Sequence, residues 1–149
     1  MPRREQKGDL HELAEQRLRR IDQRYTAGRR AIVGLLAGAG HPVSIGEITR
    51  GLPDLPRSSA YRHLVDLQAA GIVRRVAASD EFTRFELAED LTGHHHHLLC
   101  ANCGRVTDIT FSPGLERSIA RAVAQIAGAE NFQPVSHSLD ILGLCSSCR

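Results

Sequence analysis

Apolar residues recur at helical spacing through the first half of the chain and alternate with polar ones in several later stretches. Residues 9–25 and the segment after Thr26 both carry leucine, isoleucine or valine three or four positions apart, and Thr26 is a plausible N-cap for the second of these helices. Gly38 to Gly40 would end that helix, Ser44 could cap a short third one, and another helix would follow Pro56. The N-terminal part is therefore predicted to be largely helical.

Two short stretches after these helices have the composition of β-strands. Residues 72–78, IVRRVAA, and 82–88, FTRFELA, are separated by turn-forming residues at 78–81, so we expect an antiparallel hairpin. Helices followed by such a hairpin are typical of a winged helix-turn-helix, in which the helix after Pro56 enters the major groove of DNA.

Side chains near the start of that helix are the candidates for DNA contact: Arg57, Ser59, Tyr61 and Arg62. Arg62 could contact guanine or a phosphate, and Tyr61 a thymine methyl group or a phosphate. The alternative is an ordinary exposed arginine beside a half-buried tyrosine.

The pattern changes beyond residues 89–93, EDLTG, which we interpret as a hinge. Residues 94–100 and 105–109 each fit a strand, Ser112 and Pro113 open an amphipathic helix, and the alternation from Val135 to Leu142 predicts another strand. We therefore expect an α+β chain of two domains. Residues 1–90 would form the winged-helix domain, with 1–20 as an N-terminal extension or helix, and residues 91–149 an α/β domain.

Composition alone does not identify a partner. The 149 residues are 42% hydrophobic and 24% charged, enough for one globular domain or two small ones, and the net charge is only +2. The six arginines in residues 17–30 could face phosphates or form a solvated helix face. No apolar run approaches the roughly 18 residues of a membrane span, and the N-terminus has no apolar core of a secretion signal. We expect a cytoplasmic protein without a membrane partner.

Four cysteines form two Cys-x-x-Cys pairs that lie far apart in the sequence. In a reducing compartment, metal ligation is a better interpretation than two disulfides or redox chemistry. A redox site needs only one pair, whereas two pairs can close one tetrahedral zinc site. The predicted structural zinc ligands are Cys100, Cys103, Cys145 and Cys148.

Four consecutive histidines, His94 to His97, lie just before the first Cys-x-x-Cys pair. A purification tag is the simplest alternative, but tags lie at termini and this run is followed by 52 residues of ordinary sequence. Successive side chains of a strand point to opposite faces, so His95 and His97 would leave one face and His94 and His96 the other. One run can therefore contribute imidazoles to two sites for first-row metals.

Five segments together resemble the ferric uptake regulator family of metal-dependent bacterial repressors: AYRHL, FEL, HHHHLLCANCG, HSLDILGLC and CSSC. The resemblance covers roughly residues 20–149. One departure is in the recognition helix, where the family usually has Thr-Val-Tyr-Arg and this chain has Ser59, Ala60, Tyr61 and Arg62. The resemblance implies a repressor of metal-uptake genes rather than an enzyme, a homodimer formed by the C-terminal domain, and a palindromic DNA operator.

The resemblance also implies roles for individual residues. The four cysteines correspond to the family's structural zinc ligands. The regulatory metal site corresponds to His41, Glu86, His95 and His97. A second site in the dimerisation domain corresponds to His94, His96, Glu116 and His137, with Asp108 as a possible additional oxygen ligand.

Each of the softer ligands has an ordinary structural alternative. His41 could be a loop residue before Pro42, and Glu86 a solvent-facing strand carboxylate. Glu116 could favour the positive end of its helix, and His137 could be a hydrogen-bonded core residue.

The regulatory ion implied by the resemblance is Fe²⁺, Zn²⁺ or Mn²⁺, with iron favoured because the donors are nitrogen and oxygen. Zinc-sensing relatives typically have a further cysteine in the wing or hinge, and FELAEDLTG has none. A peroxide-sensing member is a third possibility because Asp108 matches an aspartate used there, although such sensors have Asp where this chain has Glu86.

Two other classes of protein are weaker interpretations. A zinc hydrolase or deaminase would need a His-Glu-x-x-His helix or a His-x-Glu partner for its cysteines, and a four-cysteine zinc has no open position for water. A metal buffer would leave the AYRHL helix and the hairpin without a purpose.

Overall fold

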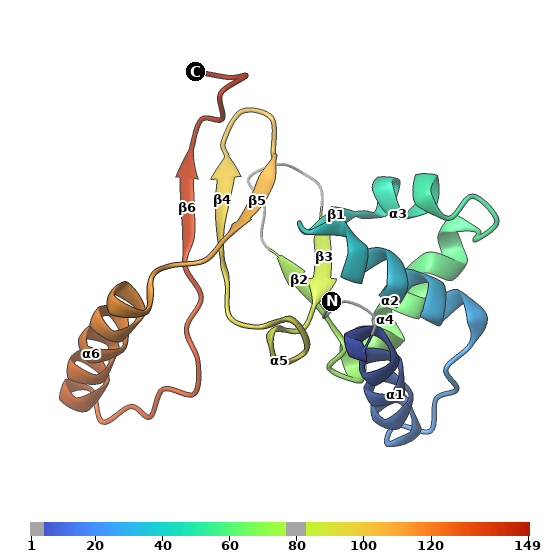
Figure 1. Cartoon of the computed structure of the whole chain (residues 1–149), viewed down its shortest axis with the longest axis horizontal. Coiled ribbons are helices and arrows are strands. Elements are labelled where there is room, and N and C mark those ends of the chain that lie inside the picture. Colours follow the sequence, from blue (N-terminus) through green and yellow to red (C-terminus); the bar gives the residue numbers. More distant parts are fainter. Residues whose placement is uncertain (1–4, 77–82) are drawn as a thin grey trace.

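Four helices and a small antiparallel sheet make up the N-terminal part of the chain (Figure 1). The computed structural model describes residues 5–76 and 83–149. The helices are α1 (Glu5–Arg19), α2 (Ala27–Ala39), α3 (Ile45–Gly51) and α4 (Arg57–Ala69). The strands β1 (Val43–Ser44), β2 (Val73–Val76) and β3 (Arg84–Leu87) form one antiparallel sheet in the order β1-β3-β2. This arrangement is the predicted winged helix-turn-helix.

Side-chain caps explain where α2 and α3 begin. The Thr26 hydroxyl accepts a hydrogen bond from the backbone N–H of Arg29, and Gly40 ends α2 in the left-handed conformation at φ 67°. Ser44 and Glu47 form a reciprocal capping box at the start of α3. These features confirm the predicted caps of both helices.

One hydrophobic core joins the helices to this sheet. On α4 the buried stripe consists of Ala60, Leu64 and Leu67, as predicted, and it packs within the same core as Phe85 of β3. An ion pair also connects α2 with α4. The guanidinium of buried Arg29 on α2 donates to the carboxylate of Asp66 on α4. The inner face of α4 is therefore fixed by both apolar contacts and an ion pair.

The C-terminal part has a second three-stranded sheet and one long helix. Its elements are β4 (His96–Cys100), β5 (Val106–Ile109), α6 (Pro113–Ala129) and β6 (Asp140–Gly143). β4 is central, with β5 antiparallel on one side and β6 parallel on the other. Ser112 caps α6 through the backbone N–H of Leu115, and α6 lies on the side away from the N-terminal helices (Figure 1).

This second sheet buries few apolar side chains within one subunit. Among the described residues from 94 onward, the buried hydrophobic ones are Leu99, Cys100, Val106 and Ala127. Two histidines, His96 and His97, are buried as deeply, with 0% and 4% of their surface exposed. Large hydrophobic side chains remain exposed on α6, on the loop after it and around β6: Leu115, Ile126, Phe132, Val135, Ile141, Leu142 and Leu144. Apolar burial alone gives this sheet little support, so its polar clusters must contribute.

The segment between the two sheets is helical. Residues Glu89–Thr92 form the single turn α5, closed by a 2.7 Å hydrogen bond from the Gly93 N–H to the Glu89 carbonyl. Arg17 of α1 reaches this turn and donates to the carboxylate of Asp90. The expected hinge is therefore an ordered turn held by α1, and the domain boundary near residue 90 stays a prediction.

Several element boundaries differ from the prediction, and those of α1 and β6 differ most. α1 ends at Arg19 rather than near residue 25, because Asp22 takes a left-handed backbone conformation at φ 56°. The strand expected from Val135 to Leu142 is wrong for its first part, since β6 begins only at Asp140. In the parallel register His97 lies opposite Asp140 and also donates to the Leu139 carbonyl at 3.3 Å, but β4 begins only one residue before His97, so among the described residues its pairing with β6 stops near Asp140.

The β2–β3 hairpin carries a third strand, β1, on its other side. The strand β1 was not predicted, since only two residues pair with β3. The turn predicted at 78–81 lies outside the described residues, although β2 and β3 do pair as expected. None of the helices described here combines the length and apolarity needed to cross a lipid bilayer.

Candidate functional site

Four thiols meet at the C-terminal end of β4 and just after β6. Cys100 ends β4 and Cys103 lies in the turn after it, while Cys145 and Cys148 follow β6, which runs parallel to β4. The four sulfur atoms lie within 4.8 Å of one another. The Sγ atoms of Cys103 and Cys145 are 3.7 Å apart. Sulfurs bound tetrahedrally to zinc at about 2.3 Å would be about 3.8 Å apart, so the arrangement fits a closed zinc site.

Backbone amides favour the ionised form of one of these thiols. Hydrogen bonds from the N–H groups of Cys103, Cys145 and Asn102 lower the pKa of Cys100 to about 6. The N–H of Cys145 lies 3.4 Å from the Cys100 sulfur. Since the thiolate is the form that binds zinc, the surroundings of Cys100 suit a structural zinc ion.

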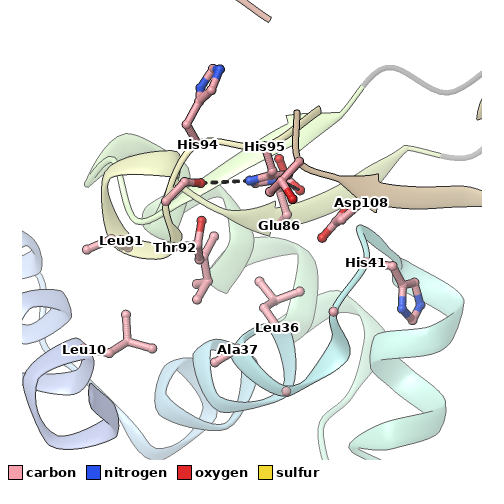
Figure 2. Close-up of a pocket in the computed structure, with 15 residues that line it drawn as sticks. Leu10, Leu36, Ala37, His41, Glu86, Leu91, Thr92, His94, His95 and Asp108 are labelled. Carbon is pink, nitrogen blue, oxygen red and sulfur yellow. Dashed lines mark hydrogen bonds and ion pairs between the residues drawn. The ribbon is translucent and has the colours of Figure 1, made fainter. Parts of the chain in front are cut away.

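A second cluster lies where the two sheets meet, around the buried side chain of Glu86. Its Oε2 atom lies 3.0 Å from His95 Nε2 and 3.2 Å from His97 Nε2. Asp108 on β5 lies opposite His97 in the strand register and joins the same cluster. One possible ligand atom from each of these four residues lies within 4.8 Å of the others, and Figure 2 shows Glu86, His95 and Asp108 close together.

The donor atoms of this cluster are oriented as a cation would require. His95 Nδ1 lies 3.0 Å from the Gly93 carbonyl and His97 Nδ1 lies 2.9 Å from Asp140 Oδ1, so both Nε2 atoms face Glu86. The buried Oδ1 atom of Asp108 has no hydrogen-bond partner among the described residues. A divalent cation would satisfy this acceptor, and two nitrogen and two oxygen donors fit Fe²⁺, Mn²⁺ or Zn²⁺.

Electrostatics agree with this orientation. Burial raises the pKa of Glu86, but hydrogen bonds from His97 and His95 and the adjacent Arg74 guanidinium outweigh burial and bring that pKa to about 2. Burial lowers the pKa of His97, but its hydrogen bonds to Glu86 and Asp140 leave the pKa raised overall. The cluster therefore stabilises positive charge beside an ionised carboxylate.

The third cluster joins α6 to the start of β4. His96 Nε2 lies 2.9 Å from Glu116 Oε1, and His94 Nε2 lies 3.1 Å from His137 Nε2. The Glu116 carboxylate also approaches both His94 and His137, and the four possible ligand atoms lie within 4.8 Å of one another. Phe111 stacks on the His96 ring at 4.3 Å between centroids. The alternation predicted for the histidine run is confirmed, because neighbouring histidines face different clusters.

The outer face of α4 presents polar and aromatic side chains. Tyr61 is 45% exposed, and the Arg57 guanidinium lies 5.8 Å from its ring centroid. The Arg62 guanidinium lies 3.4 Å from the Ser59 hydroxyl, one turn earlier on the same helix. Val65, 64% exposed and one turn after Tyr61, extends this face with an apolar side chain that sequence reasoning missed.

Comparisons with known proteins identify the family. Residues 20–142 match the model of the Ferric uptake regulator family. The chain belongs to this family. It is 30% identical to the peroxide operon regulator of Bacillus subtilis over 145 residues, covering 93% of this chain and 94% of that protein. It is 33% identical to the peroxide-responsive repressor PerR of Staphylococcus saprophyticus over 138 residues, covering 89% and 86%. The crystal structure of the Vibrio cholerae ferric uptake regulator matches with a TM-score of 0.70 and 29% identity over 88% of this chain and 98% of that one.

Membership of the ferric uptake regulator family confirms the predicted fold class and the general function. The protein is a metal-responsive transcriptional regulator that binds DNA as a dimer, and it is not an enzyme. The winged helix is its DNA-binding part, and the C-terminal sheet with α6 is its dimerisation part. The exposed apolar side chains on α6 and around β6 therefore lie on the half of the subunit that dimerises.

Two predicted metal ligands lie elsewhere than expected. His41 is outside the Glu86 cluster, and Figure 2 shows its ring apart from Glu86 and His95. Its Nδ1 atom lies 2.8 Å from the Ala39 carbonyl and its Nε2 atom 3.4 Å from Glu47 Oε1. Asp108 was expected beside the His94 cluster but lies in the Glu86 cluster. The reason is that β5 places Asp108 opposite His97, whose side chain leaves the face of the sheet turned toward Glu86.

Sequence reasoning missed three residues that hold these ligands in place. Asp140 holds His97, Glu89 contacts His94 Nδ1, and Arg74 donates to Glu86. Arg74 pairs with Glu86 because the two residues lie opposite each other in the hairpin. The sequence would have predicted this pair if the length of the turn had been known. Asp140 offered no such signal, because its position depends on the parallel pairing of β6 with β4.

Replacing Cys145 with serine should remove the ion from the four-thiol cluster and destabilise the C-terminal sheet, because structural zinc contributes directly to folding. Metal content by elemental analysis and the thermal melting temperature would measure both effects. Ser146→Ala, which changes the neighbouring side chain, is the matched control. A Cys145→Ser protein that kept its zinc and its melting temperature would contradict a four-thiol site.

Replacing Arg62 with alanine should weaken DNA binding by about 1–3 kcal/mol, or roughly 5- to 150-fold, without altering metal content. Duplexes selected by the wild-type protein from a random-sequence pool would serve as probes in a titration. Arg117→Ala removes a guanidinium from exposed α6 and controls for charge. Equal losses in the two variants would place the DNA surface elsewhere.

Proposed function

We propose that Glu86, His95, His97 and Asp108 bind the divalent ion that regulates this protein. One observation carries the proposal: the donors come from both sheets, with Glu86 on β3 of the winged helix and the other residues on or beside β4 and β5. His41 lines the same cavity of about 610 Å³ as Glu86, His95 and Asp108. Its ring would have to turn away from Ala39 and Glu47 to join them.

Shared ligands explain how such a site would control DNA binding. A bound cation supplies positive charge that donors of both sheets share, so it favours the conformer in which β3 lies against β4. In a two-fold dimer this conformer would set the two α4 helices roughly 34 Å apart, one turn of DNA, to match the half-sites of a palindromic operator. Linkage then requires operator DNA to tighten ion binding in return.

The other two clusters serve structural roles in this proposal. The four thiols would hold Zn²⁺ in a closed site that fixes the end of β4 relative to β6. His94, His96, Glu116 and His137 would hold a second ion that ties the first turn of α6 to the sheet. Both sites would support the dimerisation half, which has little apolar core of its own.

Among regulatory ions we favour Fe²⁺, which would make the protein a repressor of iron-uptake genes. The Glu86 cluster offers only nitrogen and oxygen donors, and all four cysteines of the chain lie in the other site. The similarity to the ferric uptake regulator of Vibrio cholerae supports the same choice. Regulation by zinc is the nearest alternative, since Zn²⁺ also accepts this donor set.

Replacing His97 with alanine should abolish metal-dependent operator binding but leave folding and structural zinc intact, because His97 lies outside the four-thiol cluster. Gel shifts with Fe²⁺, Mn²⁺ and Zn²⁺ titrated separately would test this and rank the ions. His11→Ala removes an imidazole outside the three clusters and serves as the control. Unchanged metal-dependent shifts in His97→Ala would remove His97 from the regulatory set.

Peroxide sensing is a second candidate function, favoured by one observation of the structure. Asp108 lies in the Glu86 cluster, and the two relatives described above are named for their response to peroxide. In this case hydrogen peroxide should release the iron-loaded protein from DNA and spare the manganese-loaded protein, because ferrous iron is readily oxidised by peroxide. Gel shifts before and after peroxide treatment, with a catalase control, would measure this. Equal resistance of both forms would leave iron sensing without peroxide sensing.

A further inference from the structure

Arg74 is in direct contact with a proposed metal ligand although it cannot bind a cation itself. Its Nε atom donates to Glu86 Oε1 at 2.6 Å, and the Glu86 side chain is 8% exposed. The contact is built into the wing, because Arg74 on β2 lies directly opposite Glu86 on β3 in the antiparallel register. Directly opposite residues on one face of a sheet have their Cβ atoms about 5 Å apart, which suits an arginine and a glutamate.

The two oxygens of the Glu86 carboxylate therefore have separate partners. Oε1 accepts from Arg74, whereas Oε2 faces the Nε2 atoms of His95 and His97 at 3.0 and 3.2 Å. A guanidinium stays charged at every physiological pH, so its hold on Oε1 persists. A charge-assisted hydrogen bond of this kind is among the stronger ones in proteins.

We propose that Arg74 is a positioning residue that restricts Glu86 to ligation through one oxygen and thereby helps to select the ion. The inference rests on the proposed regulatory site. With Oε1 held by Arg74, Glu86 offers one oxygen to the cluster that it forms with His95, His97 and Asp108. If Oε1 were released, the carboxylate could turn and bind through both oxygens.

One-oxygen ligation matters because ions differ in the number of donors they accept. Zinc sites in proteins are usually four-coordinate, whereas manganese suits a larger set of oxygen ligands. A contact that withholds one carboxylate oxygen therefore disfavours manganese relative to zinc. Since Arg74 belongs to β2, the same contact makes ligand geometry in the site depend on the β2–β3 hairpin of the DNA-binding domain.

Arg74→Met tests the inference, because it keeps a long side chain and removes the donor; Arg74→Ala repeats the test with a smaller one. The proteins would be zinc-loaded at the thiol site and carry His137→Ala to weaken the other nitrogen and oxygen cluster. Cobalt(II) titration would be followed by visible absorption, which weakens as the coordination number rises. Competition titrations would give the relative affinity for Mn²⁺ and Zn²⁺.

Both Arg74→Met and Arg74→Ala should lower the cobalt absorptivity and shift the affinity ratio toward Mn²⁺ by about tenfold or more, the lower range for loss of a group that holds a metal ligand. Arg74→Lys keeps a donor for Oε1 and should restore most of the wild-type spectrum. Arg75→Ala is the matched control, since Arg75 is the next residue of β2 and its guanidinium donates to Thr83 instead.

The inference is overturned if both donor-free variants keep the spectrum and affinity ratio of Arg75→Ala. Glu86→Gln separates this failure from failure of the proposed function. If Glu86→Gln loses cobalt binding while the Arg74 variants are unchanged, the regulatory site stands and the role of Arg74 falls. If Glu86→Gln also binds cobalt like the control, the proposed site and the inference fall together.

Discussion

The buried carboxylate of Glu86 is the contact on which the relation between the two halves of the subunit depends. It belongs to β3 of the winged helix, yet its nearest partners outside that sheet are His95 and His97 of the dimerisation half. A buried carboxylate is costly unless it is paired, so this junction stabilises the subunit only while positive charge surrounds it. Arg74 supplies a permanent positive charge and the two imidazoles hydrogen-bond to the carboxylate, and a bound ion would take the place of any Nε2 protons that face Glu86. In the proposed regulatory site, this buried charge would make the relative position of the two halves depend on the ion bound there.

The polar clusters of the dimerisation half matter for its stability because the sheet has little apolar core. Its sheet has one central strand and short neighbours, and few apolar side chains are buried in a single subunit. Two of its most deeply buried side chains are imidazoles, which need polar partners to be stable there. The exposed apolar residues of α6 and β6 indicate that the remaining stabilisation comes from the second subunit, since this family acts as a dimer.

Local signals in the sequence predicted most of the fold. Thr26 and Ser44 cap helices by contacts within three residues, and the stripe of Ala60, Leu64 and Leu67 follows from helical periodicity, so no long-range information was needed. The four-thiol cluster was predictable because each Cys-x-x-Cys pair is local. Asp108 was assigned to the wrong cluster because its place depends on which residue of β4 it faces. Asp140 was missed and the β6 boundary misplaced for the same reason. The local pattern of apolar and polar residues does not predict how distant strands pair.

The histidine run leaves one ambiguity that the rest of the fold has to resolve. Because His94 to His97 are identical in type, a slip of β4 by one residue would still place imidazoles at three of the four ligand positions, so the histidines alone specify the alignment only weakly. Three residues further along, Cys100 has no equivalent neighbour that could replace it among the four thiols. The position of Cys100 in the thiol cluster therefore fixes the register of β4. This register places His95 and His97 beside Glu86, and His94 and His96 beside Glu116.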